Sequence, residues 1–218
     1  MSTSLGADVL AFAAVAGLLT IIPGLDTALV LRAAVTHGRS YAFATALGVN
    51  SGVLVWGVGA AAGVAALLTA STAASTALRF VGAAYMIFLG SRFLHDAWHS
   101  RRAAPSKLVS DADARRSPNG VAIAWRHGFI TNLANPKVGA FYLALLPQFI
   151  PRESPHILVG VLLATVHNLE GITWFSLLIL GIHGGRSWIM RFRTQRTLNA
   201  ITGVVLITFA STLVLRDN

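Results

Sequence analysis

The fold is decided by two stretches, IIPGLDTALV (21–30) and GFITNLANPKVGAFYLALLPQF (128–149). Each places a proline and a charged side chain, Asp26 or Lys137, inside an otherwise apolar run. A proline in a helix frees backbone groups that lipid cannot satisfy. A charge at the centre of a membrane-spanning helix costs roughly 2.5–3.5 kcal/mol on insertion scales. A chain that carries both features twice is expected to line a polar path with them.

Composition places the chain among membrane proteins. Of its 218 residues, 55% are hydrophobic and 11% are charged, and the mean hydropathy is +0.66. Soluble domains carry about 25% charged residues. Cysteine is absent, which excludes disulfides and thiolate metal sites. The net charge of +9 comes from basic residues grouped between hydrophobic runs, which indicates membrane topology rather than nucleic-acid binding.

The hydrophobic runs predict six membrane spans, since each is near or above the ~20 residues that a helix needs to cross the bilayer. Most Lys and Arg residues lie in the loops after the first, third and fifth runs. The positive-inside rule therefore predicts that these loops are cytoplasmic and that both termini are on the non-cytoplasmic side. The runs cover residues 9–31, 41–69, 73–97, 121–150, 156–184 and 198–215.

A polar, proline-containing linker at about residues 99–120 divides the chain into two halves of three runs each. Because three is odd, the halves have opposite orientations, which is the condition for an inverted repeat. We expect one transmembrane domain over residues 1–218, with repeats at about 1–98 and 121–218. The predicted fold is an all-α integral membrane protein of two inverted three-helix repeats, with helices one and four broken near the midplane.

The residues at the two breaks predict half-helices. Pro23 and Gly24 open the first helix, which places Asp26 in the first turn after the break, where the helix dipole favours a carboxylate. The alternative is a simple proline kink with Asp26 satisfied by a neighbouring helix. In the second break, Asn135 is expected to cap the following half-helix and Pro136 to occupy its first position.

Lys137 then lies at the end of its helix dipole that disfavours a cation. We expect an anionic partner to offset this, either Asp26 from the other half or a substrate carboxylate. The alternative is that the Lys137 side chain extends to the membrane interface. Two half-helix N-termini would form an anion site, and with a free carboxylate beside it the site suits a zwitterion such as an amino acid.

Further polar side chains lie in the spans. His167 and Glu170 are three residues apart and are expected to share a helix face. A hydrogen-bonding role, a proton relay and a metal site are all open for this pair. We expect the polar lining to be completed by Asn50, Asn132 and Asn168.

Small residues four apart predict helix packing, either within the chain or in a homodimer. The pairs with this spacing are Gly48 with Gly52 and Gly59 with Gly63.

Four segments resemble the lysine exporter (LysE) family and, within it, the threonine and homoserine exporter (RhtB) branch. They are PGLDTALVLR from Pro23, GVNSGVLVWGVGAAAG from Gly48, LRFVGAAYMIFLGSRFL from Leu78, and the stretch from Gly128 quoted above. The resemblance implies a six-helix protein of the bacterial inner membrane. It also implies export of amino acids or their derivatives, driven by the proton-motive force as an antiporter.

The match at the site is uneven. The family's Asn-Pro-Lys element is intact at Asn135, Pro136 and Lys137, whereas its Pro-Gly-Pro-Asp element has a leucine in third place, at Leu25. An acidic residue often follows the glycine at position 52 in the family, and this chain has Val53 there. Glu170 is not expected from the family pattern, and we hypothesise that it either compensates for the missing carboxylate or marks a different substrate.

The predicted function is export of a small zwitterion by alternating access, coupled to protons, with Asp26, Lys137, Glu170 and His167 as the substrate and proton-coupling residues. The alternatives are a divalent metal-cation exporter of the same superfamily and an intramembrane enzyme. We expect no catalytic residues, cofactor, bound metal or nucleic-acid partner, and a homodimer is possible.

Overall fold

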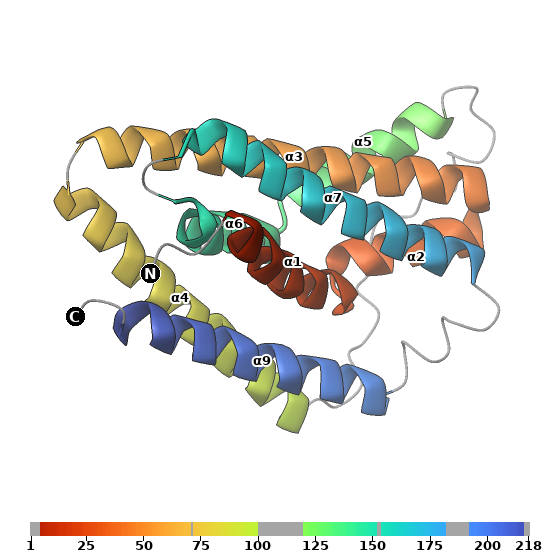
Figure 1. The fold of residues 1–218 in the computed structure, drawn as a ribbon. Helices are drawn as coiled ribbons and strands as arrows, with labels where there is room; N and C mark the ends of the chain where they lie inside the picture. Colours follow the sequence, from red (N-terminus) through yellow and green to blue (C-terminus); the bar gives the residue numbers. More distant parts are fainter. Residues whose placement is uncertain (1–4, 71, 100–119, 152–153, 182–191, 216–218) are drawn as a thin grey trace.

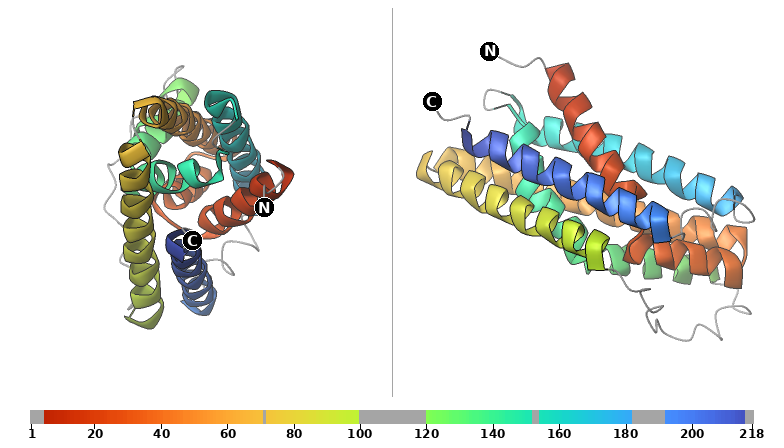
Figure 2. Two further views of the ribbon diagram at one scale, coloured as in Figure 1. Left: turned by 60° about the vertical axis from the view of Figure 1, so that its left-hand side comes forward. Right: turned by 90° about the horizontal axis from the view of Figure 1, so that it is seen from below.

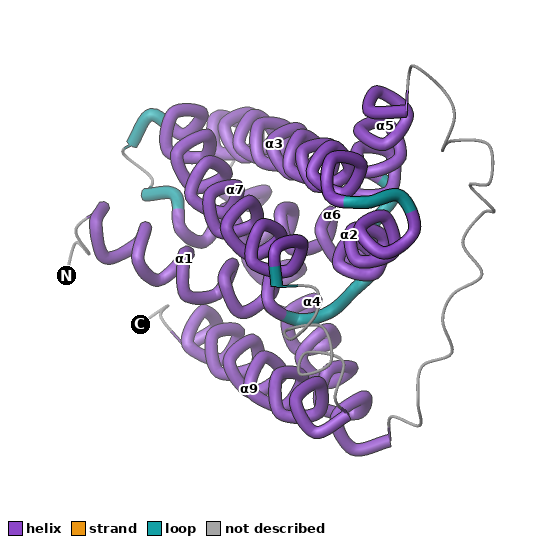
Figure 3. Tube along the Cα trace, turned by 90° about the vertical axis from the view of Figure 1, so that its right-hand side faces the viewer, coloured by secondary structure: helices purple, strands orange, loops and turns teal. Residues whose placement is uncertain are grey.

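The computed structural model describes residues 5–70, 72–99, 120–151, 154–181 and 192–215. Every regular element in these ranges is a helix (Figure 3). The helices are α1 (Leu5–Ile21), α2 (Leu25–Thr36), α3 (Arg39–Ala70), α4 (Thr72–His99), α5 (Gly120–Leu133), α6 (Pro136–Leu145), η2 (Leu146–Phe149), α7 (His156–Leu180) and α9 (Phe192–Leu215).

Two of the predicted spans are broken at the predicted positions. α1 ends at Ile21 and α2 begins at Leu25, with a bend of 53° between their axes. α5 ends at Leu133 and α6 begins at Pro136. Proline has no N–H for the helix ladder, which explains why each ladder stops where it does. α3 runs without a break for 32 residues, so the second run is one continuous helix.

Length and hydropathy identify fewer spans among the described residues than the six predicted. Two helices are long and apolar enough to cross a membrane, over Arg39–Gly63 in α3 and His156–Leu180 in α7. The bent pair α1 and α2 makes a third if it is counted as one span. The outer surface agrees with a lipid environment, because large apolar side chains such as Leu10 and Leu158 are 74% and 68% exposed. The six-span count stays a prediction.

The helices pack in two groups (Figure 1). In one group α3 lies beside α5 and α7, and in the other α4 pairs with α9. α1 and α6 lie between the groups, and the end-on view shows α6 near the middle of the bundle (Figure 2, left). α6 is also the segment whose side chains are most deeply buried, including Phe141 and Tyr142 at 0% exposure.

Glycines permit the closest helix contacts. At Gly48 a Cβ atom would lie 2.0 Å from the Trp125 carbonyl oxygen, so α3 and α5 touch backbone to backbone. Gly90 and Gly203 make the same kind of contact between α4 and α9. The packing predicted for Gly48 is therefore confirmed. Within the described residues a Cβ at Gly59 or Gly63 would meet no atom within 4 Å, so packing of this second pair in a homodimer stays a prediction.

Apolar side chains form two buried clusters. One joins α1, α6 and η2 with parts of α3, α4, α7 and α9, and contains the packed rings of Phe12, Phe141 and Phe149. The other joins α2, the start of α3 and the end of α7, and contains Val30 and Ile179. The polar residues of the two helix breaks line the cavity described next, whose walls include members of both clusters.

Candidate functional site

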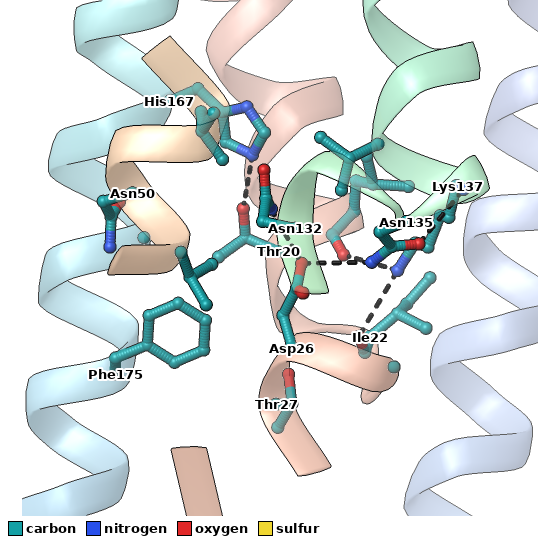
Figure 4. Close-up of a pocket in the computed structure, with 16 residues that line it drawn as sticks. Thr20, Ile22, Asp26, Thr27, Asn50, Asn132, Asn135, Lys137, His167 and Phe175 are labelled. Atoms are coloured by element: carbon teal, nitrogen blue, oxygen red, sulfur yellow. Dashed lines mark hydrogen bonds between the residues drawn. The ribbon is translucent and has the colours of Figure 1, made fainter. Parts of the chain in front are cut away.

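A small cavity lies where the two broken helices meet (Figure 4). Its volume is about 50 Å³, and a water occupies about 30 Å³ in the liquid. Residues from α1, α2, α3, α5, α6 and α7 line it, so both halves of the chain contribute. The predicted site residues among them are Gly24, Asp26, Asn50, Asn132, Asn135, Lys137 and His167.

Asp26 is held by two asparagine amides from the other half of the chain. Its Oδ2 atom accepts hydrogen bonds from Asn132 Nδ2 at 2.9 Å and from Asn135 Nδ2 at 3.1 Å. Asn135 also caps α6, since its Oδ1 accepts from the Lys137 backbone N–H at 3.1 Å. The predicted capping role of Asn135 and the predicted first position of Pro136 are confirmed. One side chain thus both starts α6 and fixes the carboxylate of α2.

The Lys137 ammonium binds the carboxyl end of α1. Its Nζ donates to the Leu19 carbonyl at 3.0 Å and to the Ile22 carbonyl at 3.4 Å (Figure 4). The Leu19 carbonyl would bond the N–H of residue 23 in an unbroken helix, but Pro23 has none. Pro23 therefore creates the acceptor that Lys137 occupies. Phe93 adds a ring face 5.7 Å from Nζ.

These partners of Lys137 differ from the anionic partner that the sequence predicted. The expected anionic partner was Asp26 or a substrate, whereas the contacts seen here are the carbonyls of α1. The negative end of the α1 dipole favours a cation at this point, even though the N-terminus of α6 does not. Between these two described side chains there is no ion pair within 4.0 Å. They are linked instead through Asn135. The interface alternative for Lys137 is wrong, because its Nζ is bonded inside the bundle.

His167 is buried between α1 and α6. Its Nδ1 and the Tyr142 hydroxyl share a hydrogen bond of 2.9 Å, and its Nε2 and the Thr20 hydroxyl share one of 3.1 Å. Thr20 in turn donates to the Ala16 carbonyl at 2.9 Å. Because that bond uses the Thr20 proton, the hydroxyl accepts from His167 Nε2, and Nδ1 then accepts from Tyr142 in a neutral ring. The chain of bonds connects α6, α7 and α1.

Glu170 and Asn168 lie outside this cavity. Glu170 faces Gly17 of α1, in a separate groove between α1 and α7. His167 and Glu170 share no hydrogen bond within the described structure, although they are three residues apart. Such residues are about 60° apart around a helix, and Thr20 of α1 lies between them, lining both cavities. Asn168 is buried and bonds the Ala164 carbonyl of its own helix at 3.2 Å.

The cavity offers unused hydrogen-bond acceptors. Among the described residues, Asp26 Oδ1 and Asn132 Oδ1 are buried and have no hydrogen-bond partner. A buried acceptor without a partner is costly, so both oxygens favour a ligand that donates, such as an ammonium group. Beside them, the N-terminus of α2 lacks a side-chain cap in the described structure, and Gly24 there lies next to the Lys137 ammonium. Backbone N–H groups and a cation together favour a carboxylate.

The remaining walls are apolar. They include Val49, Val53, Val138 and Phe175, together with Leu19 of α1. Val53 stands in the place where an acidic residue was expected from the family, so this part of the wall is apolar here. The site therefore combines a carboxylate, an ammonium group and a hydrocarbon surface.

The described ranges contain no set of metal ligands that would support the metal-exporter alternative. No group of three or more His, Cys, Asp or Glu side chains comes together there in a way that would hold a metal ion. The oxygens that lack partners belong to an aspartate and an amide, and a structural divalent site usually needs more ligands than this.

Several residues that shape the site were not singled out from the sequence. Tyr142 and Thr20 orient His167, and Trp56 donates to the Asn132 carbonyl at 3.4 Å. Pro136 cannot bond that carbonyl, which accepts instead from the Asn135 backbone N–H at 3.0 Å and from Trp56. Tyr142 could have been found from the sequence, because a tyrosine hydroxyl within an apolar run needs a buried hydrogen-bond partner.

Comparison with known proteins identifies the family of this chain. The profile of the LysE type translocator family matches residues 10–217. The membrane protein YrhP of Bacillus subtilis (strain 168) is 28% identical over 203 residues, which cover 93% of this chain and 96% of that protein. Leucine efflux proteins of Salmonella typhimurium and Salmonella typhi are each 27% identical over 197 residues, or 89% of either chain. No solved structure matches the chain. With a profile that spans nearly its whole length and relatives matched almost end to end, this transmembrane protein belongs to the LysE type translocator family.

Proposed function

We propose that the protein exports an amino acid with an apolar side chain across the bacterial inner membrane, by proton-coupled antiport with alternating access. The observation that carries this is the set of complementary groups in the central cavity. Asp26 Oδ1 and Asn132 Oδ1 have no hydrogen-bond partner among the described residues and can accept from an ammonium group. Lys137 and the α2 N-terminus attract an anion. Phe175 lies on the apolar wall (Figure 4).

The substrate ammonium binds Asp26 and Asn132, and its carboxylate draws Lys137 away from the α1 carbonyls. Releasing Leu19 and Ile22 loosens the end of α1, because Lys137 makes the hydrogen bonds from α6 to these two carbonyls. A proton on Asp26 would displace the ammonium and return Lys137 to the carbonyls. This exchange couples the substrate to the proton and to the position of α1.

The cavity of about 50 Å³ is too small for an amino acid, so the substrate enters only when helices move apart. The packing supports two inverted repeats as the moving parts. In the proposed pairing α3 corresponds to α7 and α4 to α9, and each helix packs against its counterpart. Gly57 meets Ala164 and Gly160 meets Ala61, which makes α3 and α7 antiparallel, as inverted halves require.

The substrate is proposed to be leucine or a similar amino acid. The apolar wall supports this, and so do relatives named as leucine efflux proteins. Threonine and homoserine, the substrates of the branch that the sequence resembles, are the competing proposal. Non-cytoplasmic termini, one domain with repeats at about 1–98 and 121–218, and a homodimer stay predictions of the same account.

The test is efflux of radiolabelled L-leucine from loaded proteoliposomes, with and without a pH gradient, in parallel with threonine, homoserine and Mn²⁺. We expect leucine to leave faster than from protein-free vesicles, and faster still when protons can flow inward. Flux of Mn²⁺ alone would instead support the metal-exporter alternative. An absence of flux for every solute would contradict transport and leave the enzyme alternative.

A further inference from the structure

A second cavity lies beside the first, in the groove between α1 and α7. Its volume is about 390 Å³, several times that of the central cavity. It opens on the outer face of the bundle, where Leu169 and Leu177 are 61% and 62% exposed. Its walls are mainly apolar and include Ile21. The groove therefore has room for a small organic molecule, which the central cavity lacks.

Two polar atoms in this groove have no hydrogen-bond partner among the described residues. Glu170 Oε2 and Trp174 Nε1 are shielded from solvent, and within the described part of the chain neither makes a hydrogen bond. The two side chains are four residues apart, so they lie one turn apart on the same face of α7. One is an acceptor with negative charge when ionised, and the other is a donor.

The donor and acceptor together select the chemical class of the ligand. Thr173 satisfies neither atom, because its hydroxyl proton goes to the Leu169 carbonyl at 2.7 Å and Trp174 Nε1 makes no hydrogen bond among the described residues. An ammonium group satisfies Glu170, and a carboxylate oxygen accepts from Trp174. An apolar side chain covers Leu169 and Leu177. An ammonium group, a carboxylate and an apolar side chain together make up the substrate proposed above. The groove lies outside the central site.

We propose that this groove is a second binding site for an apolar amino acid, with Glu170 binding the ammonium group and Trp174 the carboxylate. Thr20 separates the groove from the central cavity and lines both. A rotation of α1 at the Pro23 break moves Thr20 and joins the two cavities. The groove is then a vestibule through which substrate reaches or leaves Asp26. The identity of the ligand rests on the proposed function, whereas the existence of the site rests on the groove itself.

The test is equilibrium binding of radiolabelled L-leucine to the full-length protein in nanodiscs. The wild type is expected to bind two leucines per chain. Asp26→Asn removes the central site and should leave one, and adding Glu170→Gln should remove the other. Glu170→Gln alone should weaken groove binding by roughly tenfold or more, the usual effect of losing a hydrogen bond to a charged group. Asp96→Asn, which changes an exposed carboxylate on α4, is the matched control.

Two analogues test the assigned contacts. Isoamylamine has the ammonium but no carboxylate, and 4-methylpentanoate has the reverse. Isoamylamine should compete for the groove in the Asp26→Asn protein, and 4-methylpentanoate should not. Trp174→Phe keeps the ring, so it should weaken leucine binding and leave isoamylamine binding unchanged. This variant also serves if Glu170→Gln fails to fold.

One leucine per chain in the wild type, or two in Glu170→Gln at unchanged affinity, would overturn the proposal. Efflux measurements separate this failure from failure of the proposed function. Normal leucine efflux with a single binding site would contradict the proposal of a site in the groove and leave the proposed export function standing. Two binding sites without any efflux would support the site in the groove and contradict the proposed export function.

Discussion

Gly52 leaves the space that the Asn132 side chain occupies while it holds Asp26. A Cβ atom at position 52 would lie 2.6 Å from Asn132 Oδ1 and 2.9 Å from Asn132 Cβ. An ordinary contact begins at 3.4 Å, so Gly52→Ala forces Asn132 to retreat by about 0.8 Å, the difference between 3.4 and 2.6 Å. We expect such a shift to break the bond of 2.9 Å from Asn132 Nδ2 to Asp26 Oδ2.

The loss should appear as weaker substrate binding. A hydrogen bond to a charged group contributes about 1.5–3 kcal/mol, so the half-saturating leucine concentration should rise roughly ten- to a hundredfold. The assay is initial leucine efflux from proteoliposomes over a range of internal concentrations. Gly59→Ala is the matched control, because it lies on the same helix α3 and a Cβ there meets no atom of the described structure within 4 Å.

A wild-type half-saturating concentration in Gly52→Ala would contradict this role of Gly52. Equal impairment of Gly59→Ala and Gly52→Ala would also contradict it, since a general intolerance of alanine in α3 would explain that result. Thermal unfolding of each variant shows whether the protein is intact.

Two more predictions concern the groups around the cavity. Pro23→Ala restores the N–H that bonds the Leu19 carbonyl, so it should raise the thermal unfolding temperature and lower efflux at least tenfold, because Lys137 loses its acceptor; normal efflux would show that the break is dispensable. Tyr142→Phe leaves His167 Nδ1 unpaired in a buried place and should destabilise the protein by about 1–3 kcal/mol, measured by chemical unfolding in detergent. An unchanged unfolding midpoint would show that this hydrogen bond contributes nothing to stability.

The helix breaks could be predicted from the sequence because they depend on local chemistry. Pro23 lacks a donor, Asn135 is a good cap and Pro136 fits a first helical turn, and none of these needs a distant partner. The structure shows the breaks where those residues stand. The location of Lys137 inside an apolar run could likewise be read from the neighbouring sequence.

The partners of these residues depend on tertiary placement. Lys137 was expected to meet an anion, but the end of α1 lies close enough to supply carbonyls, and the sequence does not say which helix end comes near. Likewise His167 and Glu170 were treated as one pair. α1 packs against α7 between them, with Thr20 as the divider, and so assigns them to different cavities.

Proton-coupled export depends most on Asp26, the group proposed to exchange the substrate ammonium for a proton opposite Lys137. The direct measurement is proton-driven leucine efflux by Asp26→Asn protein reconstituted at wild-type levels, with Asp96→Asn as control and Lys137→Ala in parallel. We predict that Asp26→Asn and Lys137→Ala each abolish efflux while folding and inserting normally, and that the control is unchanged. Wild-type efflux, with its usual acceleration by a pH gradient, in the Asp26→Asn protein would contradict the account.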